Sequence, residues 1–318
     1  FPERIVKLIY ASHADLNTII EECDYVAEFR KAKEATSFWT EMTNEEQAEW
    51  VEDLLSRTRI SEDARVSVCI LDTGVNSSHP LLSHSIDESD CLSFDSDWGT
   101  HDHDKHGTLM AGVVLYGDLK YCLETHSFID LTHKLESVKI LPSDGQNSVE
   151  LWGHITSQCI SRIEIKSPDQ DRLFCMAITS EDTRDRGRPS SWSAEIDQLC
   201  AGLNDETKRL IILASGNTID NISNYPSSQE TNCVHDPAQS WNALTVGAYT
   251  QLTTLNDPVH RGYRALAPID GLSPFSSSSL LFENKWPIKP EVLMEGGNIA
   301  INDNGDLDNA EDLSVLST

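Results

Sequence analysis

Apolar and polar positions alternate in two different rhythms from about residue 66 onward. Short apolar runs predict buried strands, and longer stretches with an apolar residue at every third or fourth position predict helices. The predicted strands are residues 66–71, 135–141, 173–179, 210–214 and 243–248. The predicted helices are residues 106–114, 151–162 and 193–203. Because strands and helices follow one another in turn, the pattern indicates an α/β fold with a parallel sheet flanked by helices.

The first 62 residues have a different pattern. Residues 4–10 alternate weakly and predict a strand, whereas residues 15–55 are rich in Glu, Ala, Lys and Leu, contain no proline and predict two or more helices. Thr43, followed by acidic residues at 45 and 46, is a suitable N-cap for the last of these helices. We therefore expect a helical N-terminal extension over residues 1–62 and an α/β domain over residues 63–318.

Polar residues follow two of the predicted strands directly. Asp72 comes after the run 66–71, and Asn217 lies just past the run 210–214. His106 opens a predicted helix that begins with small residues. Since the carboxyl ends of parallel strands form the edge where open α/β sheets build their sites, these three side chains are expected to converge there. The Asp72 carboxylate is expected within hydrogen-bond reach of the His106 ring.

These residues stand in short motifs whose order resembles that of the subtilisin-like serine peptidases, the subtilases. The motifs are Asp72-Thr73-Gly74, His106-Gly107-Thr108 and Leu213-Ala214-Ser215-Gly216-Asn217. Residues 241–248 and 289–298 also resemble segments of that family, so the resemblance runs from about residue 65 to residue 298. It implies a subtilisin-like parallel sheet flanked by helices, and the hydrolysis of peptide bonds in a protein or peptide substrate without a cofactor.

The resemblance also implies a role for each of the three residues. His106 would act as the general base, and Asp72 would hold its Nδ1 proton and stabilise the imidazolium. Asn217 would donate its amide to the oxyanion of the tetrahedral intermediate, the alternative being a buried structural asparagine. In the same way, Asp72 in a purely structural role would cap the strand end through Thr73 and Gly74.

The nucleophile is the missing member of the set. Subtilases carry it in a Gly-Thr-Ser turn, and no Gly-Thr-Ser occurs in this sequence. Ser317 is nearest to the required position, but it lacks the preceding glycine and a following helix. We therefore expect the serine beyond Thr318. The alternatives are a catalytically inactive subtilase-fold module for binding or regulation, and a cleavage product that stays associated with a piece carrying the serine.

Two segments depart from the family pattern. Residues 180–189 form a charged loop where the family has a short turn beside the substrate. We interpret this segment as a solvent-exposed surface loop rather than one that determines substrate specificity. Leu109 stands where many relatives have a second histidine, which removes a polar group beside the base.

The composition limits which classes of ligand and partner the protein is expected to bind. The net charge of −28 argues against nucleic acid, which requires clustered Lys and Arg. Residues 303–308 carry oxygen ligands suited to calcium but no glutamate at loop spacing, and a solvated turn is the preferred interpretation. The His101-Asp102-His103-Asp104 run could bind a metal, but no further histidines complete such a site, so a solvated loop is preferred. We expect no metal and no cofactor.

The cysteines and the apolar runs bear on location. The eight cysteines show no paired spacing, and Cys69 and Cys175 lie inside apolar runs, where a free cysteine acts as a small apolar residue. Free thiols in a reducing cytoplasm are preferred over the alternative of disulfides. No apolar stretch approaches the roughly 18 residues of a transmembrane helix, so no membrane association is expected. Some similar intracellular subtilases are paired with an ATPase of the AAA class, and the helical extension would suit such a partner. Secreted subtilases carry a propeptide at this position, which is the alternative for residues 1–62, but such propeptides are small strand-rich modules and a structural or partner-binding helical extension is preferred.

Overall fold

A computed structural model describes most of the chain. The described residues are 11–23, 25–26, 36–40, 42–61, 64–125, 127–180, 186–218 and 222–318. The strand expected at residues 4–10 lies outside them, as do residues 181–185 of the charged loop.

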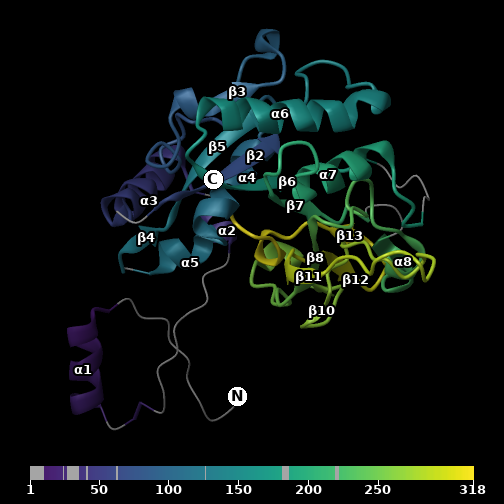
Figure 1. The fold of residues 1–318 in the computed structure, drawn as a ribbon. Helices are drawn as coiled ribbons and strands as arrows, with labels where there is room; N and C mark the ends of the chain where they lie inside the picture. The colour runs from purple at the N-terminus through teal and green to yellow at the C-terminus, as the bar shows by residue number, and fades with distance from the viewer. Residues whose placement is uncertain are drawn as a thin grey trace.

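An α/β sheet forms the centre of the fold (Figure 1), which confirms the predicted class. Within the described residues eight strands form it, in the order β10-β8-β7-β6-β2-β5-β3, with β11 also paired to β8. Every pairing is parallel except that of β10 with β8. The strands are β2 (Val66–Asp72), β3 (Cys91–Ser93), β5 (His133–Lys139), β6 (Asp171–Met176), β7 (Leu210–Ala214), β8 (Leu244–Thr250), β10 (Gly271–Leu272) and β11 (Val292–Glu295).

All five predicted strands are present, and β7 has the predicted bounds. Two strands end at other residues than predicted, because pairing with neighbouring strands determines where each one stops. Strand β6, expected to reach residue 179, stops at Met176, whose partner is Leu213 near the end of β7. Strand β8 runs on to Thr250 because β10 and β11 both pair with it.

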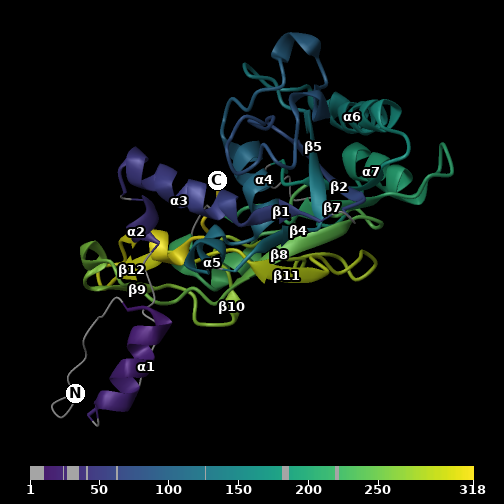
Figure 2. The ribbon, with the colours of Figure 1, turned by 90° about the vertical axis from the view of Figure 1, so that its left-hand side faces the viewer.

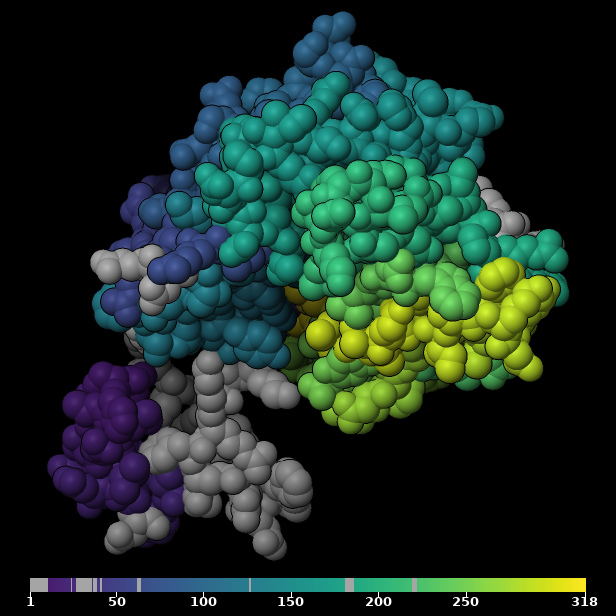
Figure 3. Space-filling model, in the orientation of Figure 1, coloured from purple at the N-terminus to yellow at the C-terminus, as the bar shows by residue number. Residues whose placement is uncertain are grey.

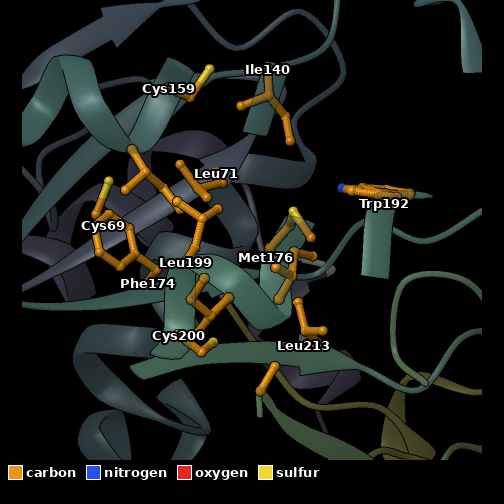
Figure 4. Packing of buried hydrophobic residues seen from close by; sticks show 14 of the residues in the cluster. Cys69, Leu71, Ile140, Cys159, Phe174, Met176, Trp192, Leu199, Cys200 and Leu213 are labelled. Atoms are coloured by element: carbon orange, nitrogen blue, oxygen red, sulfur yellow. The ribbon is translucent and has the colours of Figure 1, made fainter. Parts of the chain in front are cut away.

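Strand β2 has helices on both sides, which explains its unbroken apolar run. Its side chains alternate between two cores. Cys69 and Leu71 face helices α6 (Trp152–Lys166) and α7 (Ser191–Ala201), together with Phe174, Met176 and Leu213 (Figure 4). Val68 and Ile70 face helices α4 (His106–Tyr116) and α5 (Leu119–Glu124) on the other side. The three helices predicted for the domain are α4, α6 and α7.

The N-terminal extension contains helices α1 (His13–Glu22), α2 (Ser37–Thr40) and α3 (Asn44–Ser56). The predicted cap of α3 is confirmed, because Thr43 and Glu46 form a reciprocal capping box. Helix α1 buries no residue and stands apart from the sheet (Figures 1 and 2; purple in Figure 3).

The rest of the extension packs on the domain. Leu54 and Trp39 are buried in the same core as α4 and α5. After α3 the chain forms β1 (Thr58–Ile60), a strand that the sequence pattern does not predict, paired in parallel with β4 (Ile129–Leu131). The backbone N–H of Thr36 donates to Asp312 Oδ1 at 3.0 Å. Trp39 and Leu54 of the extension therefore share a core with the sheet.

Smaller elements complete the fold. A second sheet joins β9 (Tyr263–Ala265), β12 (Ala300–Asn302) and β13 (Leu307–Asp308), and α8 is Ser227–Thr231. Single 3-10 turns lie at Glu88–Asp90, Ser96–Trp98, Val149–Leu151, Ile222–Asn224, Pro258–His260 and Glu311–Leu313. Among the helices that the structure describes, none has the length and apolar character needed to cross a membrane.

Candidate active site

Asp72 is the last residue of β2, at the carboxyl edge of the sheet. Its side chain is fully buried, so its charge requires partners. The backbone N–H of Thr73 donates to Oδ1 at 2.7 Å. His106 Nδ1 lies 2.8 Å from Oδ1 and 2.9 Å from Oδ2. The expected contact between Asp72 and His106 is confirmed.

Glycines let the two motifs come this close. A Cβ at Gly107 would lie 2.0 Å from the Gly74 carbonyl oxygen and 3.2 Å from the Asp72 Cβ, so any larger residue would push the first turn of α4 away from β2. Gly74 itself has φ +105°, which favours glycine, and a Cβ there would meet the Thr100 carbonyl oxygen. The Gly residues beside Asp72 and His106 are therefore steric requirements of this arrangement.

The pKa of His106 is raised above its ordinary value. The hydrogen bond to Asp72 is the main cause; partial burial opposes it, and the charges of Asp72, Asp104 and Asp102 add to it. Since the folded-state pKa exceeds the unfolded one, the protonated ring stabilises the fold below the unfolded-state pKa. That contribution is lost as the pH rises through the folded-state pKa.

The second ring nitrogen of His106, Nε2, is open, which here means free to accept a hydrogen bond from a substrate or a nucleophile. With Nδ1–H donating to Asp72, Nε2 of the neutral ring is an acceptor. Among the described residues, none forms a hydrogen bond with Nε2, and 45% of the side chain is exposed. The pair can therefore take up a proton at Nε2 while the buried carboxylate stabilises the resulting cation.

Asn217 lies at the same edge of the sheet, past the end of β7, with β6 between β7 and β2. Its backbone forms a bridge with Ser276, whereas its side chain is exposed and its amide has no hydrogen-bond partner among the described residues. It lines a hollow of about 720 Å³ together with Phe275, Leu307 and Asp308. Asn217 is thus an exposed residue that lines this hollow, and its role as oxyanion donor stays a prediction.

Ser317 is engaged elsewhere. Its Oγ donates to the Leu109 carbonyl oxygen at 2.6 Å, and Thr318 Oγ1 donates to that of Thr108 at 3.0 Å. The Leu119 N–H donates to the Leu316 carbonyl oxygen at 2.9 Å. Leu316 therefore lies at the start of α5, and Ser317 and Thr318 lie along α4. The Ser317 hydroxyl bonds to the main chain of α4 rather than to the His106 ring.

Asp102 differs from the expected solvated loop. Its neighbours His101, His103 and Asp104 are exposed as expected, but Asp102 is partly buried and accepts hydrogen bonds from Thr108, Thr73 and the Asp104 N–H. Burial alone would raise the pKa of Asp102, but these donors together lower it. A sequence signal for this role existed, because Lys105, directly before the helix, is a poor N-cap and an acceptor had to come from elsewhere.

Two cysteines and the acidic segment 303–308, all within the described residues, are not reactive centres. Burial raises the pKa of the Cys175 thiol to about 11 and that of Cys159 to about 12, so both stay protonated. Asn302 Oδ1 accepts the backbone N–H groups of Asn304 and Asp306, which closes the acidic segment into an exposed turn. Within the described residues, no group of three or more His, Cys, Asp or Glu side chains could hold a metal ion.

Comparison with known sequences shows the family to which this domain belongs. The sequence model of the Subtilase family matches residues 63–318. The chain therefore belongs to the subtilase family, and the domain is a subtilase-family peptidase domain. A protein substrate follows from that membership.

Several solved structures are similar to the chain at low sequence identity. The CspB protease of Clostridium perfringens is 12% identical with a TM-score of 0.50, covering 80% of this chain and 80% of that one. Sphericase is 16% identical with a TM-score of 0.47, covering 80% of this chain and 74% of its own. A psychrophilic protease is 18% identical with a TM-score of 0.47, covering 88% and 79%. No curated protein matches the chain.

Proposed function

We propose that the protein is a serine endopeptidase whose acid, base and oxyanion donor are Asp72, His106 and Asn217. The observation that carries the proposal is the His106–Asp72 pair with its open Nε2. A serine hydroxyl loses its proton to Nε2 as its oxygen attacks the scissile carbonyl. Asp72 stabilises the imidazolium, Asn217 donates to the oxyanion, and His106 returns the proton to the leaving amine.

The nucleophile of this proposal lies beyond residue 318. In support, no described hydroxyl is hydrogen-bonded to His106 Nε2, and Ser317 is bonded to Leu109. Thr318 lies against Thr108, in the first turn of α4. A chain that continues from Thr318 would therefore start close to the His106 ring.

A fluorophosphonate probe tests the proposal, because it reacts only with an activated serine. The native protein, with the chain that follows residue 318, is expected to be labelled and to hydrolyse peptides, whereas residues 1–318 alone are not. Labelling of residues 1–318 would place the nucleophile on a serine within them. A native protein that is never labelled would instead be the inactive module for binding or regulation.

Asn217→Ala is expected to lower kcat of the native protein by about 10²–10³, because an oxyanion donor acts mainly in the transition state. KM and thermal stability should change little, since the amide is exposed. Asn309→Ala is the matched control: Asn309 lines the same hollow and is also exposed. Equal kcat values for the two variants would remove Asn217 from the proposed mechanism.

We further propose a reducing, cytoplasmic location, supported by the free, protonated thiols of Cys159 and Cys175. An ATPase partner remains a prediction. Helix α1, which buries no residue, supplies surface on which such a partner could bind.

A further inference from the structure

Helix α4 starts without an ordinary cap. Its N-cap residue, Lys105, has a left-handed backbone with φ 69° and no capping side chain. The first N–H groups of a helix have no partner within it and need an acceptor. Asp102 supplies one, because its Oδ2 accepts the Thr108 N–H at 2.8 Å and the Thr108 hydroxyl at 2.6 Å.

The other oxygen of Asp102 reaches the end of β2. Thr73 Oγ1 lies 2.8 Å from Asp102 Oδ1 and donates to it. The same Thr73 oxygen accepts the Gly107 N–H at 3.1 Å. Asp102 and Thr73 thus fasten the first turn of α4 to the residue after Asp72, beside the His106–Asp72 hydrogen bond.

A buried lysine holds the loop that carries Asp102. Lys139 is 1% exposed and lies opposite Asp72 in the register of β5 and β2. Its Nζ donates to the His101 carbonyl oxygen at 2.9 Å and to Ser143 Oγ at 3.0 Å. Burial lowers the pKa of Lys139, and the charge of Asp102 opposes that shift. The loop is therefore fixed to the sheet as well as to the helix.

We propose that Asp102 is a positioning residue that holds the His106 ring in the orientation in which Nδ1 meets Asp72 and Nε2 stays open. The proposal rests on the proposed function for its catalytic meaning, but the orientation exists in residues 1–318 and is measurable there. Asp102 acts through Thr108, Thr73 and Gly107 and makes no hydrogen bond to the ring. A displacement of about 1 Å can cost about 10²-fold in rate, so small losses of orientation matter.

The test follows the Nδ1 proton of His106 by NMR in the 318-residue chain. A ring N–H bonded to a carboxylate gives a far-downfield signal, which is assigned by its absence in His106→Gln. The charged groups facing the ring are Asp72 from β2 and Asp102 and Asp104 from the preceding loop. Asp104→Ala is the matched control, because it removes an equal charge but retains the N–H that donates to Asp102.

Asp102→Ala is expected to abolish the downfield signal and to lower the pKa of His106 more than Asp104→Ala does. Asp102→Asn is expected to retain the signal, since its oxygen can accept from Thr108 and its amide can donate to Thr73 Oγ1. The asparagine loses only the acceptor for the N–H of the exposed Asp104. Retention of the signal in Asp102→Ala would overturn the proposal. Loss of the downfield signal in Asp102→Asn as well would also overturn the proposal, because the charge of Asp102 rather than its hydrogen bonds to Thr108 and Thr73 would then orient the ring.

If Asp102→Ala fails to fold, Thr73→Val provides the second test. The valine keeps the shape but removes the donor to Asp102, the acceptor for Gly107 and the 3.2 Å contact from Oγ1 to Asp72 Oδ1, so faster exchange of the Nδ1 proton is expected. An unchanged exchange rate would overturn the proposal. None of these measurements requires the serine, so failure here is distinct from failure of the proposed peptidase activity, which the fluorophosphonate probe reports.

Discussion

Turnover of the native protein is expected to fall by about a millionfold when His106 is replaced by alanine, because a triad acts as one unit and loses nearly all its effect with its base. The structural reason is that Nε2 of His106 is the open acceptor next to the buried charge of Asp72. The measurements are peptide hydrolysis and fluorophosphonate labelling, both of which should disappear.

His103→Ala is the matched control for that experiment. His103 is exposed and lies in the loop just before α4, so its loss should leave the rate unchanged. Thermal unfolding of both variants separates catalysis from folding. If His106→Ala still hydrolyses peptides at a rate near that of the unmodified protein, the base lies elsewhere and the proposed mechanism is wrong.

Asp72→Asn should lower kcat by about 10⁴ while the fold is retained. The Thr73 N–H already donates to Oδ1, so an asparagine oxygen would stay with that donor and turn its NH2 toward His106 Nδ1. The ring would then carry its proton on Nε2 and could not accept one from the serine. The structure thus predicts the wrong tautomer, not merely a weaker contact.

The same variant has a pH signature. The hydrogen bond to Asp72 is the main cause of the raised pKa of His106, so Asp72→Asn lowers that pKa. Activity of the unmodified protein should rise as the pH passes through the raised pKa, because the base must be neutral. NMR titration of His106 and the pH profile of kcat/KM measure the shift. Asp104→Asn, at an exposed carboxylate, is the control, and equal rates and pKa values for the two variants would contradict the assignment.

The local pattern of apolar and polar residues was enough to predict much of the sheet and the contact between Asp72 and His106. The run before Asp72 and the run at residues 210–214 are apolar because β2 and β7 are covered, and covered strands have this composition wherever they occur. The motifs around His106 were readable because the close approach of α4 and β2 requires glycine at 74 and 107. Thr43 was predicted as a cap because capping depends on residues three apart.

Contacts between distant segments were decided only by the tertiary structure. Asp102 in the sequence looks like one acidic residue of an exposed loop, since its role depends on Thr73, 29 residues earlier. Lys139 lies in the predicted strand 135–141, but only the structure shows that it is buried and that its ammonium group donates to the carbonyl oxygen of residue 101. The predicted strand before Asn217 was enough to locate this residue at the carboxyl edge of the sheet. Its exposure, however, depends on which other segments leave that edge uncovered. Short-range periodicity records which face of an element is buried, whereas the partner of a polar group is set by how the elements pack together.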